Sequence, residues 1–111
     1  MPKHVVVVLS EPVKGREEEF EDWYENTHIR EVLETTGWES GQRFVLTAEK
    51  GQKCPLGRLA FYEAEAENGE DVIATLDATR SARKQSDSFN RKSAGLWVFS
   101  ETGQKHHRGG D

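Results

Sequence analysis

The fold is decided by the stretch Gly15-Arg-Glu-Glu-Glu-Phe-Glu-Asp-Trp-Tyr-Glu-Asn-Thr-His-Ile-Arg-Glu-Val-Leu33. On a helical wheel that advances about 100° per residue, Trp23, Tyr24 and Thr27 fall within about 60° of Phe20. Such a stripe is typical of a helix that packs one side against a core. The first half of the stretch therefore predicts an amphipathic helix that begins near residue 16.

A second apolar group in the same stretch is out of phase with the first. At the same step per residue, its members fall on the far side of the wheel: Ile29, Val32 and Leu33. One straight helix cannot bury both groups, and the phase breaks near His28. We therefore expect a helix over residues 16–27, followed by a kink or a new turn that runs to about residue 34.

His28 lies at this joint, four residues after Tyr24 and three before Glu31. These spacings place side chains next to one another on a helix surface. One interpretation is a functional histidine held by its neighbours. The alternative is that His28 caps the first helical segment, where a partly charged imidazole meets the helix dipole. Spacing alone leaves both interpretations open.

The composition indicates one small domain that is short of hydrophobic residues. The chain has 111 residues, of which 34% are hydrophobic, and its mean hydropathy is -0.80. An oligomer that shares apolar surface would relieve this shortage. The net charge is -5 and the pI about 5.4, which argue against a nucleic-acid partner.

The cysteine content, the hydropathy and the first residues bear on where the protein is expected to reside. The single cysteine, Cys54, excludes an internal disulfide and suits a reducing compartment. No apolar run approaches the ~20 residues of a membrane span. The residues at 1–4 run straight into the strand-like segment 5–9, too abruptly for a signal peptide. We therefore expect a cytoplasmic protein.

The order of the expected elements predicts the topology. Alternating or continuous apolar residues mark the strands, and Asn68 with Asp71 three residues later marks the start of a second helix. The expected elements are a strand at 5–9, the interrupted helix at 16–34, strands at 38–48 and 58–66, a helix after Asn68 and a strand at 94–101. This β-α-β-β-α-β order is the ferredoxin-like arrangement, an α+β fold.

In that arrangement a four-stranded antiparallel sheet carries both helices on one face. The domain spans residues 1–103, and residues 104–111 form a polar C-terminal tail without an apolar side chain. The other face of the sheet must be polar or must meet a second sheet, and the aromatic residues of these strands favour the latter. We therefore expect a homodimer.

The segment from Phe20 to Leu33, followed by Gly37-Trp38 and Gln42-Arg43-Phe44, resembles the dimeric α+β barrel superfamily. Within it, the segment is most similar to EthD-like proteins and the REDY-like HapK group. The close resemblance covers about thirty residues, and the element order extends it to the chain. Proteins of this kind usually carry a proline two residues after the histidine, where this chain has Arg30. The resemblance implies the homodimeric barrel but leaves the chemistry open, because such barrels host many reactions.

We expect the functional site to be a pocket between the first helix and the sheet, with His28 as its acid-base group. Histidine suits this role because its ordinary pKa of about 6.5 lets both of its forms exist near neutrality. The hydroxyl of Tyr24 would polarise a carbonyl or stabilise an enolate, and Glu31 would fix the tautomer of His28. The expected ligand-binding residues are Asn26, Arg43, Phe44, Tyr62 and Trp97.

Each binding residue also has an ordinary structural explanation. Arg43 is the right type for an ion pair with one of the many acids, and Asn26 for a helix end. Phe44, Tyr62 and Trp97 are equally suited to packing on the sheet. Alternation along the strands does not show which face meets the helices, so the inward-pointing members cannot be chosen from the sequence.

Metal and cofactor motifs are missing from the sequence. The four histidines show no recognisable ligand spacing, and a glycine-rich phosphate loop is absent. The haem-degrading branch of the resembled superfamily implies a histidine on the second helix, and residues 71–83 contain none. We therefore expect no metal and no cofactor.

The favoured function is cofactor-independent acid-base chemistry on a small aromatic or polyketide-like molecule, such as cyclisation, dehydration or isomerisation. One alternative is a non-catalytic binding or accessory protein of a biosynthetic or degradative pathway that uses the same pocket. Another is a cofactor-free monooxygenase, which needs only an enclosed apolar cavity and a base. The sequence does not decide whether the protein is an enzyme, and it names neither substrate nor pathway.

Overall fold

A computed structural model describes residues 1–109 of the chain. It has four strands and three α-helices, with a π-helical turn (η1) and a 3₁₀ turn (η2) between them. The elements are β1 (Lys3–Ser10), α1 (Glu17–Trp23), η1 (Tyr24–His28), α2 (Ile29–Thr36), β2 (Ser40–Val45), β3 (Arg58–Glu65), α3 (Gly69–Ala78), η2 (Arg80–Ala82) and β4 (Gly95–Ser100). Since α1, η1 and α2 form one interrupted helix, the predicted element order is confirmed.

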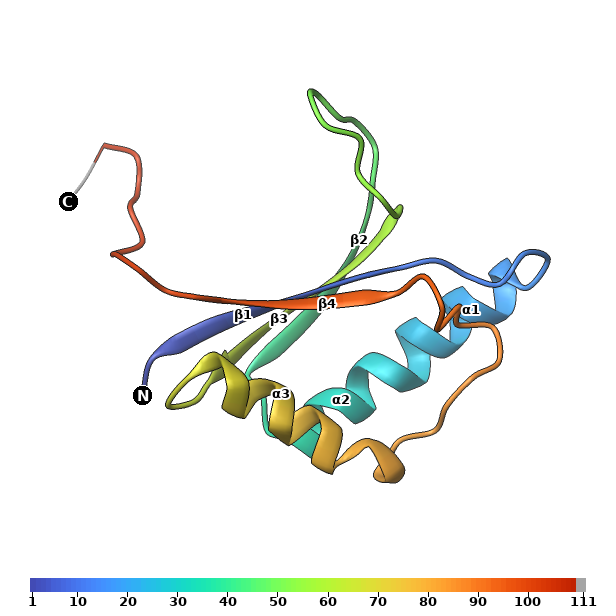
Figure 1. Ribbon diagram of the computed structural model, residues 1–111, viewed down its shortest axis with the longest axis horizontal. Coiled ribbons are helices and arrows are strands. Elements are labelled where there is room, and N and C mark those ends of the chain that lie inside the picture. The colour runs from blue at the N-terminus through green and yellow to red at the C-terminus, as the bar shows by residue number, and fades with distance from the viewer. Residues whose placement is uncertain (110–111) are drawn as a thin grey trace.

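The four strands form one antiparallel sheet in the order β2-β3-β1-β4. Within residues 1–109, all helices lie on one face of this sheet, and the other face carries no helix (Figure 1). The α+β class and the antiparallel sheet are therefore confirmed, and the arrangement is compatible with a ferredoxin-like fold. No helix within residues 1–109 is long and apolar enough to cross a membrane.

The predicted phase break is a π turn inside one interrupted helix. The Ile29 amide donates to the Tyr24 carbonyl, five residues back, so this turn holds one more residue than an α turn. The extra residue rotates the rest of the helix by about 100°, which brings Val32 to within about 20° of Phe20 on the wheel. Both side chains reach the core, with exposed fractions of 2% for Val32 and 0% for Phe20. The π turn therefore buries two stripes that a straight helix would set apart.

Deleting Asn26, an exposed residue of this turn, is expected to leave the protein folded. With one residue fewer, the turn can close as an ordinary α turn while the flanking stripes keep their phase. We expect the free energy of unfolding in urea to change by less than about 1 kcal/mol. Inserting one alanine after Asn26 should instead turn Val32 out of the core and cost about 3 kcal/mol or more. A large loss on deletion would contradict this explanation of the turn.

The core lies between the helices and the inner face of the sheet. Directly opposite strand residues share a face, and Val6 is opposite both Tyr62 and Val98. The helices add Phe20, Tyr24, Val32 and Val72, all 2% exposed or less.

Asn68 caps α3, since its Oδ1 accepts a hydrogen bond from the Asp71 amide at 2.9 Å, as predicted.

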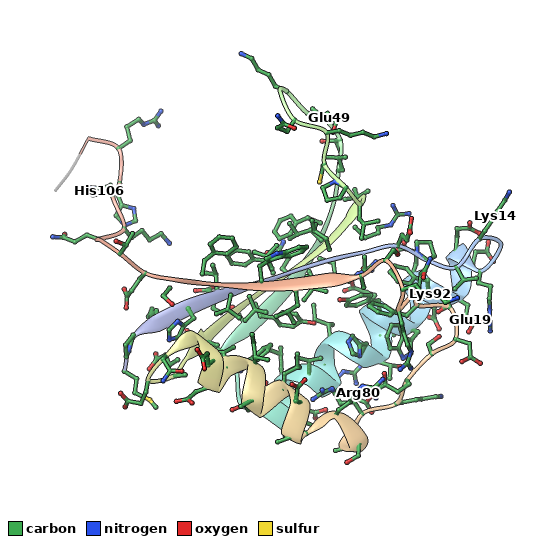
Figure 2. All side chains as sticks on the ribbon, viewed as in Figure 1. Lys14, Glu19, Glu49, Arg80, Lys92 and His106 are labelled. Atoms are coloured by element: carbon green, nitrogen blue, oxygen red, sulfur yellow. The ribbon has the colours of Figure 1, made fainter. Side chains whose placement is uncertain are left out.

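The outer face of the sheet, without helices, is rich in large apolar side chains. Phe44 is 48% exposed, Trp97 46% and Phe99 58%. Ring-bearing side chains stand on this face in Figure 2, and the β2–β3 loop and the C-terminal segment rise on the same side in Figure 1.

Residues 104–109 of the expected polar tail are exposed and lack regular structure, and the rest of that tail lies outside the described residues.

Candidate functional site

A cavity of about 270 Å³ lies between the interrupted helix, the inner face of the sheet and the segment after α3. Its volume is just below the roughly 300–1,000 Å³ of pockets for drug-sized ligands, so it suits a smaller molecule. Aromatic side chains supply much of its apolar wall, among them Trp23, Trp38 and Phe89. Its polar groups include His28, Tyr62 and Arg83. The expected pocket between the first helix and the sheet is therefore present.

His28 is the last residue of the π turn and lines the cavity. Its imidazole stacks on the indole of Trp23 with ring centres 4.4 Å apart and planes 22° apart. The Tyr24 ring meets it edge-on, at 5.0 Å and 84°. Its Nδ1 atom is buried and has no hydrogen-bond partner within residues 1–109. The ring is held by aromatic contacts, and its Nδ1 atom is left without a hydrogen-bond partner among the described residues.

A buried histidine elsewhere in the protein, His4, shows how a structural imidazole is satisfied. Both ring nitrogens of His4 have partners, the Ser100 hydroxyl at 2.8 Å and the Ala66 carbonyl at 3.0 Å. Buried polar atoms normally find such partners, and an exception calls for an explanation such as a ligand or a catalytic role. His28 is such an exception.

The cavity keeps His28 neutral at pH 7. Burial lowers the pKa of its imidazole from the ordinary 6.5 to about 4, and the positive charge of Arg83 contributes to this lowering. In a neutral imidazole one ring nitrogen carries a proton and the other accepts a hydrogen bond. At neutral pH each ring nitrogen of His28 can therefore donate or accept a hydrogen bond, according to the tautomer, without bringing a charge into the cavity.

Tyr62 provides a second polar group at the cavity. Its hydroxyl is buried and makes no well-formed hydrogen bond within residues 1–109, although the Tyr24 hydroxyl is close enough to interact with it. Burial, with the neighbouring Tyr24 hydroxyl, raises the pKa of Tyr62 above its ordinary value of 10. Its ring lies close to Gly41, where a Cβ would be only 2.8 Å from the Tyr62 Cδ1 atom. The glycine thus makes room for the ring, and the protonated hydroxyl remains a donor.

Tyr24 also lines the cavity, as predicted, and is 2% exposed. Burial raises the pKa of its hydroxyl to about 12, partly opposed by the interaction with the Tyr62 hydroxyl and by the positive charge of Arg43. The phenol is therefore protonated at neutral pH. Three residues expected at the site, Tyr24, His28 and Tyr62, are brought together by the fold.

Arg83 was not among the residues expected at the site, although it lines the cavity. Its side chain is buried and donates to the hydroxyls of Thr35 and Thr79 at 2.9 and 2.7 Å and to the Leu76 carbonyl at 2.8 Å. It comes from the polar stretch after α3, where the sequence pattern gives no sign that one arginine turns inward.

Arg43 and Asn26 lie outside the cavity. Arg43 forms ion pairs with Glu21 and, at 3.3 Å, with Glu25, and its guanidinium lies 5.0 Å from the centre of the Tyr24 ring. Asn26 is exposed, and its amide donates to Asp22 at 2.8 Å. The ordinary interpretation of Arg43 as an ion-pair partner is therefore what the structure shows.

Phe44 and Trp97 lie on the outer face of the sheet, contrary to the expectation that they line the same pocket as His28. Phe44 is opposite Leu59, and Trp97 is opposite Val7. Ala60, which follows Leu59 on β3, is buried and faces the helices. Since successive side chains alternate, Leu59 and its partner Phe44 point to the outer face. The period of two predicted the alternation but not which side is inside.

Glu31 does not contact the free nitrogen of His28. Its carboxylate accepts a hydrogen bond from the Lys84 amide at 2.8 Å, and the Lys84 carbonyl accepts one from the Trp23 indole at 3.0 Å. These two bonds fasten the segment after α3 to the interrupted helix. Glu31 therefore helps to build the cavity wall, and the expected contact with the His28 ring is not formed.

Comparisons with known proteins assign neither a family nor a function to this chain. No family model matches the sequence, and no match is found among curated proteins or among solved structures. The likeness to EthD-like proteins therefore rests on the motif around His28 alone. Residues 1–109 contain no cluster of three or more histidine, cysteine or acidic side chains that could hold a metal ion.

Proposed function

We propose that the cavity binds a small aromatic molecule bearing a carbonyl or phenol oxygen and that His28 moves a proton on it without a cofactor. The observation that carries this proposal is that two residues lining one cavity, His28 and Tyr62, each hold a buried polar atom without a well-formed hydrogen bond within residues 1–109. Since unpaired buried polar atoms cost about 1–3 kcal/mol each, a ligand that pairs with both gains that energy on binding. The aromatic wall supplies apolar contact for the ring of the ligand.

In the proposed reaction, His28 in its neutral form removes a proton from the carbon next to the carbonyl. The electron pair of the broken C–H bond moves to the carbonyl oxygen, and the enolate accepts a hydrogen bond from the Tyr62 hydroxyl. The imidazolium then returns its proton to another atom of the substrate. Burial disfavours an isolated imidazolium, so the proton is held only while the enolate provides the opposite charge.

Exchange of substrate protons with deuterated solvent tests this step without knowledge of the product. Indanone, tetralone and chromanone present the required group at a suitable size, and no metal or flavin is added. We expect protein-dependent deuterium incorporation next to the carbonyl, measured by NMR. Ligand-induced shifts of the Trp23 indole signal without exchange would instead indicate a binding protein, the main alternative. Oxygen consumption would indicate a monooxygenase.

The proposal includes a homodimer formed through the outer face of the sheet. That face presents Phe44, Trp97 and Phe99 at roughly half exposure, whereas the helix face is covered. Apolar residues that line up across strands on this face, such as Val7 with Phe61 and Trp97, form a continuous surface. Contiguous exposed apolar surface of this kind marks an interaction site, and a second copy offers a matching surface.

Light scattering at micromolar concentration is expected to give about twice 12.6 kDa. Replacing Trp97 with glutamate should give a folded monomer, because two carboxylates would be buried against apolar side chains. Replacing the exposed Thr75 on α3 with glutamate changes the charge equally and should leave the dimer intact. A stable, soluble wild-type monomer would contradict the dimer and leave the proposed cavity chemistry standing.

A further inference from the structure

Arg83 is a buried cation that forms no salt bridge within residues 1–109, although the carboxylates of Glu31 and Asp77 act on it at longer range. Its residue exposure is 7%, and no carboxylate within residues 1–109 forms a salt bridge with it. Its three hydrogen bonds go to two hydroxyls and one carbonyl, all of them neutral. A guanidinium has five N–H groups, so its Nε–H and one Nη2–H have no hydrogen-bond acceptor within residues 1–109. Buried charges are normally paired.

The cavity around Arg83 is positive in a protein that is negative overall. Arg80 and Arg91 also line it, against one acidic residue, Asp77. No salt bridge within residues 1–109 involves any of these three, and Arg91 donates only to the Gln85 side chain, at 3.3 Å. Arg80 begins η2, just after α3, and lies on the helix side of the sheet (Figure 2). Because the whole chain carries -5, this local excess of positive charge favours an anion at this site.

We infer that the ligand of the cavity is an aromatic carboxylate, with its carboxylate received by Arg83 and its ring between the aromatic side chains of the wall. The inference rests on the proposed function and narrows its substrate class. Arginine suits this contact because its planar fork matches a carboxylate with two parallel hydrogen bonds. The free atoms of His28 and Tyr62 would then lie beside the remaining part of the ligand, where the proton is moved.

A purely structural role for Arg83 makes a different prediction. Its bond to the Leu76 carbonyl lies in the last turns of α3 (Gly69–Ala78), where a positive charge meets the negative end of the helix dipole. An arginine that only caps the helix would affect stability but would not distinguish a charged ligand from a neutral one of the same shape. Discrimination between such ligands is therefore the decisive measurement.

The test compares naphthoate with naphthamide, which share a shape and differ in charge. Binding is followed by the NMR signals of the Trp23 indole and the His28 ring, at pH 7. Charge-assisted hydrogen bonds predict that wild type binds naphthoate about 10–100-fold more tightly than naphthamide. In R83Q this preference should fall to within about threefold while naphthamide still binds. R16Q removes an exposed arginine outside the cavity, one that pairs with Glu19, and should keep the wild-type preference.

The outcomes separate this inference from the proposed function. If naphthamide and naphthoate bind the cavity equally well, the carboxylate assignment is wrong and the cavity function stands. If neither perturbs Trp23 or His28, both proposals fail. Should R83Q not fold, Arg83→Lys keeps the charge without the fork and is expected to retain a reduced preference for naphthoate. If R83Q keeps the full wild-type preference for naphthoate over naphthamide, another group recognises the carboxylate and the proposed role of Arg83 is wrong.

Discussion

Replacing His28 with alanine is expected to lower the rate of substrate proton exchange by about 10²–10⁴-fold, the range over which a positioned acid-base group contributes. The effect should be large because no other imidazole lines the cavity within the described chain. Binding of a neutral aromatic ligand should persist, since Trp23, Trp38 and Phe89 keep the apolar wall. The measurement is deuterium incorporation at saturating ligand, with far-UV circular dichroism to verify folding.

Two further variants give this experiment its controls. Asn26→Ala changes an exposed residue of the same π turn and should keep the wild-type rate. Tyr62→Phe removes only the hydroxyl that donates a hydrogen bond to the enolate in the proposed reaction, and it should lower the rate by about 10²–10³-fold. An unchanged rate in H28A, with the protein folded, would show that His28 is a packing residue.

Acidification from pH 7 to pH 4 is expected to remove up to about 3 kcal/mol of stability through His28 alone. The pKa of this imidazole is about 4 in the folded protein, against an ordinary value of 6.5. Between these values the unfolded chain takes up a proton that the folded protein excludes. The contribution of neutral His28 is therefore complete above pH 6.5 and is lost as the pH falls toward 4.

Urea unfolding of wild type and H28A across this pH range isolates the effect. Carboxylates titrate in both proteins and cancel in the difference, while the alanine variant lacks the imidazole. We expect the two stability curves to converge as the pH falls, with a change in their separation of about 3 kcal/mol. Parallel curves would show that His28 titrates normally and that the cavity is open to water.

The features of the fold that the sequence predicts are those set by local periodicity. The shift in phase at His28 predicted an interruption of the helix, and the structure shows a π turn there. Asn68 and Asp71 predicted the start of α3 in the same way, because capping needs only residues three apart. The element order then led to the antiparallel sheet.

The composition of the site was harder to predict because it depends on contacts between distant segments. Alternation along a strand does not label its inner face, so Phe44 and Trp97 were expected at a cavity that they do not reach. Arg83 lies on a polar segment whose path is fixed by hydrogen bonds to Glu31 and Trp23, more than fifty residues away. No spacing rule connects such positions.

The central claim is that His28 is a partly buried, neutral imidazole that lines a ligand cavity and has one ring nitrogen without a partner among the described residues. The most direct measurement is NMR of its ring nitrogens as a function of pH, with and without naphthoate. His4 is an internal reference, since both of its nitrogens already have partners. The claim predicts a pKa of about 4 for His28 and a ligand-induced shift of its Nδ1 signal while His4 is unchanged. A His28 pKa near 6.5, with no response of its ring to the ligand, would contradict it.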